Sequence, residues 1–138
     1  MAERLKKILI VDDEKELVDS LEMALEAEGF EVLTALEGSQ ALHLARTWLP
    51  DLIVLDLMMP CMDGYAVCRL LKFDVRFQNI PILILSARAE QEDERLAQEC
   101  RADGYLTKPF RPQVLLEKIR TYLKNKEAVS PDPHSATA

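Results

Sequence analysis

The sequence lacks a hydrophobic run long enough to cross a membrane, and it has no excess of basic residues. A membrane-spanning helix needs roughly 20 consecutive apolar residues, and every apolar run here is far shorter. The short run after Lys6 and Lys7 ends in acids, so it is not a signal peptide. The net charge of −7 argues against direct contact with nucleic acid. We therefore expect a cytoplasmic protein with no membrane partner.

Cysteine is also scarce. The chain has three, Cys61, Cys68 and Cys100, an odd number without the spacing of metal ligands. A disulfide framework or a cysteine-based zinc site is therefore not indicated, and we expect reduced thiols.

Apolar segments of four or five residues alternate with helix-like patterns along the chain. The predicted strands are Lys7–Val11, Glu31–Ala35, Leu52–Asp56, Pro81–Leu85 and Gly104–Thr107. The first predicted helix has Leu17, Leu21, Ala24 and Leu25 on its apolar face and is closed by Gly29. The second, Ser39–Trp48, is expected to point Ala41, Leu42, Ala45, Trp48 and Leu49 inward. The others are a helix from about Gly64 that buries Val67, Cys68 and Leu71, then Ala89–Arg101 and Arg111–Lys126. This alternation predicts an α/β fold, a single doubly wound parallel sheet with helices on both faces. We expect one domain over residues 1–126 and a disordered tail or linker over residues 127–138.

Polar residues follow several of the predicted strands. Asp12 and Asp13 follow the first strand, Asp56 ends the third, Ser86 follows the fourth and Lys108 follows the fifth. Parallel strands place their carboxyl ends at one edge, where sheets of this kind bind ligands. Two carboxylates ~4 Å apart repel by about 4 kcal/mol at an effective dielectric near 20. Because Lys108 alone does not balance three carboxylates, we expect a bound Mg²⁺ or Mn²⁺.

Four motifs in this order resemble the receiver domain of bacterial response regulators. They are Asp12-Asp13-Glu14, Asp56-Leu-Met-Met-Pro60 with Asp63-Gly64, Ser86-Ala87, and Tyr105-Leu-Thr-Lys108-Pro109-Phe110. The resemblance runs from about Lys7 to Leu123. It implies a flavodoxin-like, five-stranded sheet with strand order 2-1-3-4-5.

The resemblance also implies a role for each residue of the site. Asp56 would accept a phosphoryl group from the phosphohistidine of a sensor kinase or phosphotransfer protein. Mg²⁺ would be held by Asp13, Asp56 and the backbone carbonyl of Met58, with Asp12 reaching it through water. Lys108 would pair with the phosphoryl oxygens, and the peptide bond between Lys108 and Pro109 would be cis.

Two further residues, Ser86 and Tyr105, would act as a switch. Ser86 would move toward the phosphoryl group and Tyr105 would turn inward behind it. The face formed by the 89–101 helix, the 104–107 strand and the last helix would then change its contacts with an effector protein or a missing output domain. On spacing alone, an aromatic residue such as Tyr105 on a short strand is more often a packing residue.

Other functions remain as alternatives. A degenerate receiver would act only as a protein-interaction module, although all five site residues are retained. A Mg²⁺-dependent phosphatase of the haloacid dehalogenase type needs a second aspartate two residues after the nucleophile, where this chain has Met58. A flavin-binding module would need a phosphate loop in place of Asp12-Asp13-Glu14. We expect no enzymatic turnover beyond the domain's own phosphorylation and dephosphorylation.

The chain departs from the usual receiver sequence at two positions. Arg101 stands where the family usually has a glycine that caps a helix, and Gly104 stands where an acid is common. If Arg101 adopts a left-handed backbone conformation, the strain is roughly 1 kcal/mol. Replacement of Arg101 by glycine is then predicted to stabilise the domain.

Overall fold

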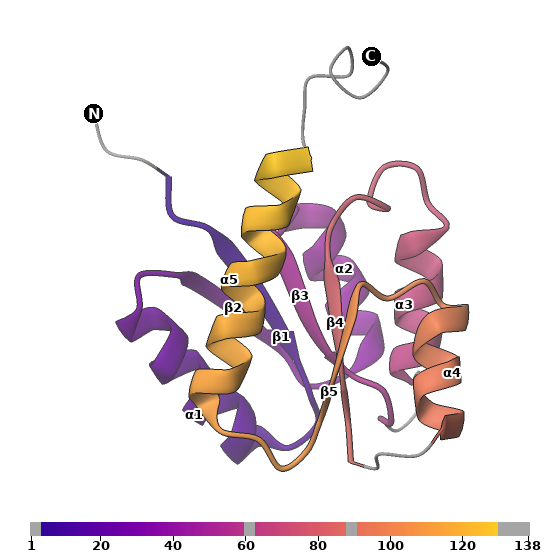
Figure 1. Cartoon of the computed structure of the whole chain (residues 1–138), viewed down its shortest axis with the longest axis horizontal. Helices are drawn as coiled ribbons and strands as arrows, with labels where there is room; N and C mark the ends of the chain where they lie inside the picture. The colour runs from indigo at the N-terminus through magenta and orange to yellow at the C-terminus, as the bar shows by residue number, and fades with distance from the viewer. Residues whose placement is uncertain (1–3, 60–62, 88–90, 130–138) are drawn as a thin grey trace.

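The computed structural model describes residues 4–59, 63–87 and 91–129. Five parallel strands form one sheet in the order β2-β1-β3-β4-β5 (Figure 1). The strands are β1 (Lys7–Val11), β2 (Glu31–Ala35), β3 (Leu52–Asp56), β4 (Ile82–Ser86) and β5 (Gly104–Thr107). The predicted sheet and its strand order are therefore confirmed. Only β4 differs in its bounds, since it begins and ends one residue later than the sequence pattern indicated.

Five helices cover the two faces of the sheet (Figure 1). They are α1 (Lys15–Ala27), α2 (Gly38–Trp48), α3 (Gly64–Lys72), α4 (Gln91–Glu99) and α5 (Pro112–Val129). One hydrophobic core lies between the sheet and α1 and α5, and a second lies between the sheet and α2, α3 and α4. Strand β3 is central and buried along its whole length. This explains its uninterrupted apolar sequence, because both of its faces pack against helices.

Some predicted boundaries and burials are wrong. Helix α5 continues to Val129, so the last domain element extends three residues into the segment predicted to be a tail. Within the described residues α4 is shorter than predicted, because it ends at Glu99. Trp48 and Leu49 were expected to point inward, yet both are exposed. The α2 helix buries Ala41, Leu42 and Ala45 instead, and Leu49 leaves it with a left-handed φ of 50°.

Two more left-handed residues close helices. Gly29 ends α1 with a φ of 94°, as its position predicted. Arg101 has a φ of 65° after α4, so the conformation considered for it from the sequence is present. The strain is therefore real at Arg101, because a side chain disfavours this region of backbone space.

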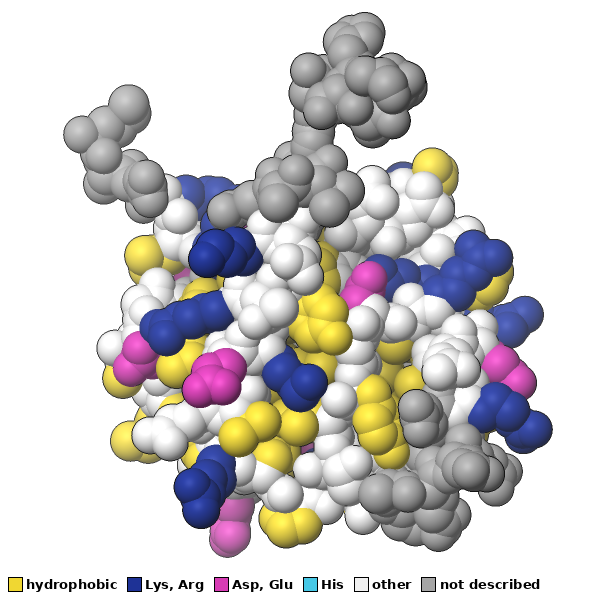
Figure 2. All heavy atoms as spheres, in the orientation of Figure 1, with side chains coloured by type: hydrophobic (Ala, Val, Ile, Leu, Met, Phe, Trp, Pro, Cys, Tyr) yellow, Lys and Arg dark blue, Asp and Glu magenta, His cyan; other side chains and the backbone are white. Residues whose placement is uncertain are grey.

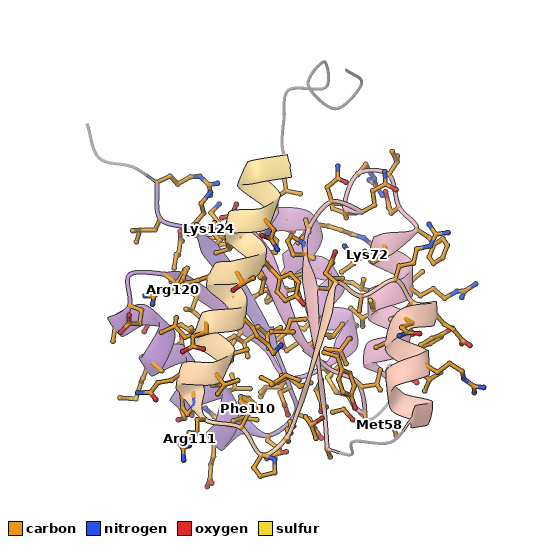
Figure 3. The ribbon with its side chains drawn as sticks, in the orientation of Figure 1. Met58, Lys72, Phe110, Arg111, Arg120 and Lys124 are labelled. Carbon is orange, nitrogen blue, oxygen red and sulfur yellow. The ribbon has the colours of Figure 1, made fainter. Side chains whose placement is uncertain are left out.

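A buried lysine joins two connections at the edge of the sheet where the strands begin. Lys72 is 6% exposed, and its Nζ donates to the carbonyl oxygens of Gln78 and Ile80 at 3.0 and 2.8 Å. The same Nζ lies 2.6 Å from the Asp103 carboxylate, which also accepts from the Ile82 N–H at 2.8 Å. This ion pair links the end of α3 (Figure 3) to the turn before β5.

Among the described residues, no helix is both long and apolar enough to span a membrane.

Candidate functional site

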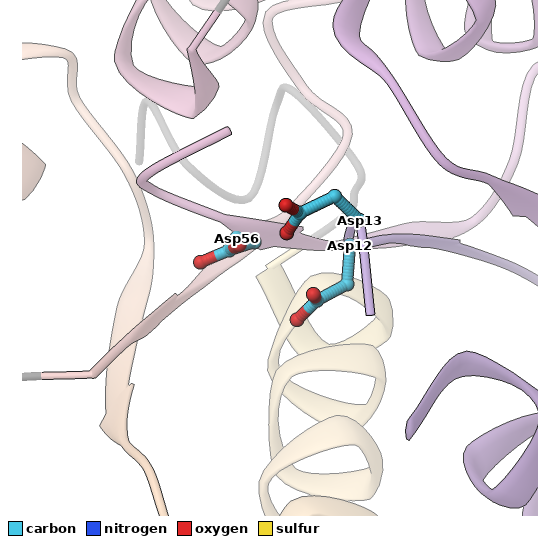
Figure 4. A group of neighbouring side chains, drawn as sticks. All are labelled: Asp12, Asp13 and Asp56. Carbon is cyan, nitrogen blue, oxygen red and sulfur yellow. The ribbon is translucent and has the colours of Figure 1, made fainter. Parts of the chain in front are cut away.

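Three aspartates converge where β1 and β3 end. Asp56 is the last residue of β3, and Asp12 and Asp13 follow β1 directly. The two strands are neighbours, with Val11 paired with Leu55. One carboxylate oxygen from each aspartate lies within 4.8 Å of the others. Figure 4 shows all three side chains pointing to the same side of the strand ends. The predicted convergence is therefore present.

The three carboxylates differ in their exposure to water. Asp12 is fully buried and Asp56 is 5% exposed, whereas Asp13 lies at the surface. The cluster therefore has one open side through which a ligand can reach it. Burial of like charges is costly, so the site needs a positive group close by.

Lys108 provides that positive group from the end of β5. Its Nζ lies 2.7 Å from Asp12 Oδ2, 3.1 Å from Glu14 Oε1 and 3.9 Å from Asp56 Oδ1. Its backbone N–H donates to the Ser86 carbonyl oxygen at 2.6 Å. The bond between Lys108 and Pro109 is cis, as the resemblance implied.

Burial and neighbouring charges shift the pKa of two residues of the site, Asp56 and Lys108. Burial, followed by the neighbouring Asp12 carboxylate, raises the pKa of Asp56 to about 7. Lys108 and the Met58 N–H act in the opposite direction but do not cancel this effect. Burial lowers the pKa of Lys108, but its close ion pair with Asp12 and the charge of Asp56 outweigh burial and raise that pKa above its usual value. Lys108 therefore stays positive, and Asp56 is incompletely ionised near neutral pH.

One buried oxygen is left without a hydrogen bond. Asp12 Oδ1 accepts from the Glu14 N–H at 2.9 Å. Within the described residues, Asp12 Oδ2 accepts no hydrogen bond and is held by its ion pair with Lys108 Nζ at 2.7 Å. A buried, ion-paired carboxylate beside two more carboxylates fits the ligand set of Mg²⁺ or Mn²⁺.

The chain beyond Asp56 folds back tightly over the strand end. The Leu57 N–H donates to the Leu85 carbonyl at 2.9 Å, and the Gly64 N–H donates to the Leu57 carbonyl at 2.9 Å. A Cβ atom at Gly64 would collide with the Asp56 carbonyl oxygen. Asp63 caps α3, since its Oδ1 accepts from the Ala66 N–H at 2.8 Å. Glycine at position 64 is thus required by close approach to the backbone of Asp56.

Met58 occupies the entrance to this turn. Its side chain is exposed (Figure 3), and its N–H lies 3.4 Å from Asp56 Oδ1. The expected metal contact from its backbone carbonyl stays a prediction. Cys61 lies outside the described residues.

The two switch candidates lie on the β4 and β5 side of the site. Ser86 is fully buried at the end of β4, beside Thr107 of β5. Tyr105 pairs with Ile84 and packs, partly buried, against the core between the sheet and α2, α3 and α4. This placement agrees with either a packing or a switch role for Tyr105, so its role stays a prediction.

Sequence reasoning missed two contributors to the site. Glu14 belonged to the acidic motif but was given no role, and it contacts Lys108. Its place next to Asp13 was the available signal. Gly64 was interpreted only as a turn residue, and its contact with the backbone of Asp56 depends on the path of the 57–64 connection, which no sequence spacing shows.

Comparison with known proteins gives the same assignment. Residues 8–120 match the family model of the response regulator receiver domain. The alkaline phosphatase synthesis transcriptional regulatory protein PhoP of Bacillus subtilis is 44% identical over 128 residues, which cover 91% of this chain and 52% of that protein. The DNA-binding response regulator MtrA of Mycolicibacterium smegmatis is 41% identical over 122 residues, covering 88% and 52%. The chain thus spans about half the length of the curated relatives it matches.

Solved structures agree in fold and length. A CheY-like response regulator receiver domain protein from Methanospirillum hungatei superposes with a TM-score of 0.85 at 31% identity, covering 92% of this chain and all of that one. A putative response regulator from Chloroflexus aurantiacus gives 0.83 at 33% identity, covering 88% and 99%. The chain therefore belongs to the response regulator receiver domain family of two-component signalling.

Proposed function

We propose that this domain accepts a phosphoryl group on Asp56 from a sensor histidine kinase or a phosphotransfer protein, in a Mg²⁺-dependent reaction. The observation that carries the proposal is the cluster of Asp12, Asp13 and Asp56 with Lys108 lying beside it. Few structural needs would explain three clustered carboxylates, two of them buried, and such clusters concentrate at functional sites.

The chemistry follows from the placement of each group. An Asp56 carboxylate oxygen would attack the phosphorus atom, and the phosphorus–nitrogen bond to the donor histidine would break. The histidine nitrogen would keep the bonding electron pair. Lys108, 3.9 Å from Asp56 Oδ1, is placed to pair with an oxygen of the transferred group.

The three aspartates would hold the metal ion, Mg²⁺ or Mn²⁺. When bound, this ion would offset the negative charge of the phosphoryl group and favour the ionised form of Asp56. Asp13 offers a carboxylate on the open side of the cluster, and Asp12, whose Oδ2 is ion-paired with Lys108 Nζ at 2.7 Å, would reach the ion through water.

A groove beside the site supports a protein as the phosphoryl donor. It has a volume of about 410 Å³ and is lined by Glu14, Leu17, Ala87, Lys108, Pro109 and Phe110. Its apolar side chains lie next to the charged cluster, so a partner that packs on them would bring its reactive group to Asp56.

The output would follow from the switch residues. Ser86 ends β4, next to the strand that carries Asp56, and Tyr105 lies on the neighbouring strand β5. A phosphoryl group contacted by Ser86 would therefore favour one packing of the surface formed by α4, β5 and α5. An effector protein or an output domain would recognise that packing. Two relatives, PhoP of Bacillus subtilis and MtrA of Mycolicibacterium smegmatis, are named as a transcriptional and a DNA-binding regulator, which agrees with an output domain in those proteins. The domain itself would catalyse only its own phosphorylation and dephosphorylation.

The test is the intact mass of the protein after incubation with acetyl phosphate and Mg²⁺. We expect one phosphoryl adduct, absent in Asp56→Asn and absent when EDTA removes the metal. Asp19→Asn, which changes an exposed aspartate of α1, serves as the matched control and should still form the adduct. An adduct that persists in Asp56→Asn would place the acceptor elsewhere. No adduct under conditions where Mg²⁺ binding is demonstrated would favour the interaction-module alternative.

A further inference from the structure

A second notable surface lies at the opposite edge of the sheet, where α3 and α4 end. We call it the arginine–phenylalanine patch and define it as Arg69, Phe73, Val75, Arg76 and Arg101. Phe73 is 51% exposed and Val75 is 77% exposed. In Figure 2, dark blue side chains gather along the right-hand edge of the molecule, over the ends of these helices. Exposed apolar side chains among basic ones are typical of contact surfaces.

The arginines are held against aromatic rings. The Arg101 guanidinium lies 4.4 Å from the centroid of the Phe73 ring, and that of Arg69 lies 5.1 Å from the same centroid. Arg76 lies 4.9 Å from the centroid of Phe77. Stacking on a ring limits the motion of each side chain, so less freedom is lost when the guanidinium binds a carboxylate.

Nearby acids neutralise only part of the patch. Asp74 pairs with Arg76 at 2.8 Å, whereas Asp103 is bound by the buried Lys72 at 2.6 Å. Within the described part of the chain, Arg69 and Arg101 form no ion pair. The patch therefore keeps the positive charges of Arg69 and Arg101 on a chain whose net charge is −7.

Arg101 is present in spite of its backbone. Its φ of 65° lies in the left-handed region, where glycine would be unstrained. The side chain that carries this strain lies over Phe73, a residue of another segment. Strain at an exposed residue that completes a surface suggests a functional use of that side chain.

We propose that the arginine–phenylalanine patch is an interaction surface for an acidic segment of a partner protein. Carboxylates of the segment would bind Arg69 and Arg101, and an apolar side chain would pack on Phe73 and Val75. Arginine and aromatic residues are the side chains that contribute most at protein interfaces. The total charge of −7 repels a long polyanion such as nucleic acid more strongly than a short segment with a few carboxylates. Because the patch lies away from the aspartate cluster, the partner would bind without covering the proposed phosphorylation site.

The probe is a short fluorescein-labelled peptide of alternating glutamate and leucine, whose binding is followed by fluorescence anisotropy. Its counterpart with glutamine in place of glutamate tests the need for charge. We expect binding to the acidic peptide that weakens as salt rises. Arg69→Ala and Arg101→Gly should each weaken it about fivefold. Arg120→Ala is the matched control, since Arg120 is an exposed arginine on α5 that pairs with Glu28 at 2.7 Å, and it should bind normally.

Amide shifts in NMR spectra should map the contact to residues around Phe73 and Val75. Unchanged binding in both patch variants, equal binding of the glutamine peptide, or absence of binding would overturn the proposal. Tighter binding of a single-stranded DNA oligonucleotide would overturn it in favour of nucleic acid. Self-association that disappears in Arg101→Gly would overturn it in favour of a second copy of the chain. Phosphorylation by acetyl phosphate should be unchanged in both patch variants, so this test is independent of the proposed phosphotransfer.

Discussion

Replacement of Asp56 by asparagine is predicted to stabilise the metal-free domain, although it removes the proposed phosphoryl acceptor. The change keeps the size of the side chain and an oxygen for the Met58 N–H, and it removes one of three clustered charges. A carboxyl group with a pKa of about 7 in the folded chain and 3.8 in the unfolded chain lowers the free energy of unfolding above pH 7, by up to roughly 4 kcal/mol. Because Asp13 is exposed and water screens the cluster, we expect a gain of roughly 1–3 kcal/mol.

The effect of Asp56 on stability depends on pH, because its pKa differs between the folded and the unfolded chain. Between the pKa of 3.8 and that of about 7, the folded chain retains a proton on Asp56 that the unfolded chain has released. The contribution of Asp56 to stability therefore falls as pH rises through this window and stays low above it. Asparagine should thus stabilise the domain at pH 8 and have little effect near pH 4.

Urea denaturation in EDTA at pH 8 and pH 4 measures this difference. Asp19→Asn makes the same chemical change at an exposed site of α1 and should give little gain at either pH. Mg²⁺ should then raise the stability of the unsubstituted domain more than that of Asp56→Asn, because binding to the folded state alone adds stability. Equal gains at both pH values, or a loss at pH 8, would refute the explanation by charge repulsion.

Three further substitutions test the fold. Lys72→Met should lower the free energy of unfolding by about 2–4 kcal/mol, because two carbonyl oxygens and the Asp103 carboxylate lose their donor. A loss below about 1 kcal/mol in urea denaturation would contradict this. Gly64→Ala should cost at least about 2 kcal/mol through its collision with the Asp56 backbone, whereas Ala66→Gly in the same helix should cost about 1 kcal/mol. Arg101→Gly should raise the melting temperature slightly, since roughly 1 kcal/mol of strain exceeds the cation–π contact of about 0.5 kcal/mol that is lost. A lower melting temperature would refute this last estimate.

Much of the fold was predictable because its signals are local. The apolar run Leu52–Asp56 and the order of strands and helices specify a parallel sheet, and parallel strands bring Asp12 and Asp56 to one edge whatever the details of packing. The burial of Trp48 was predicted wrongly because helical periodicity extends one turn too far when the chain leaves α2 through the left-handed Leu49. The end of α5 was missed because the composition after Lys126 favours a tail, although α5 continues to Val129.

The site was predictable in its members but not in its contacts. Residue types at strand ends identified the carboxylates and Lys108. The partnership of Lys108 with Glu14 depends on how the chain after β5 crosses toward α1, and the buried bonds of Lys72 depend on the path of the α3–β4 connection. Such long-range contacts have no periodic signal along the chain. The arginine–phenylalanine patch likewise joins residues about thirty positions apart in sequence (Phe73 and Arg101), and only the folded chain brings them together.

The ion pair between Lys72 and Asp103 anchors the beginning of β5. Asp103 holds the strand at its start through Lys72 and the Ile82 N–H, whereas the far end of the strand leads into Lys108, whose partners are the charges that phosphorylation would change. A change of charge at that end should therefore displace Thr107 more than Gly104, with the movement graded along the strand. If amide hydrogen exchange increases evenly along β5 after this change of charge, the beginning of the strand is not anchored. If exchange increases toward Thr107, only the end of β5 near Lys108 moves. The beginning of the strand and the nearby arginine–phenylalanine patch then keep their structure.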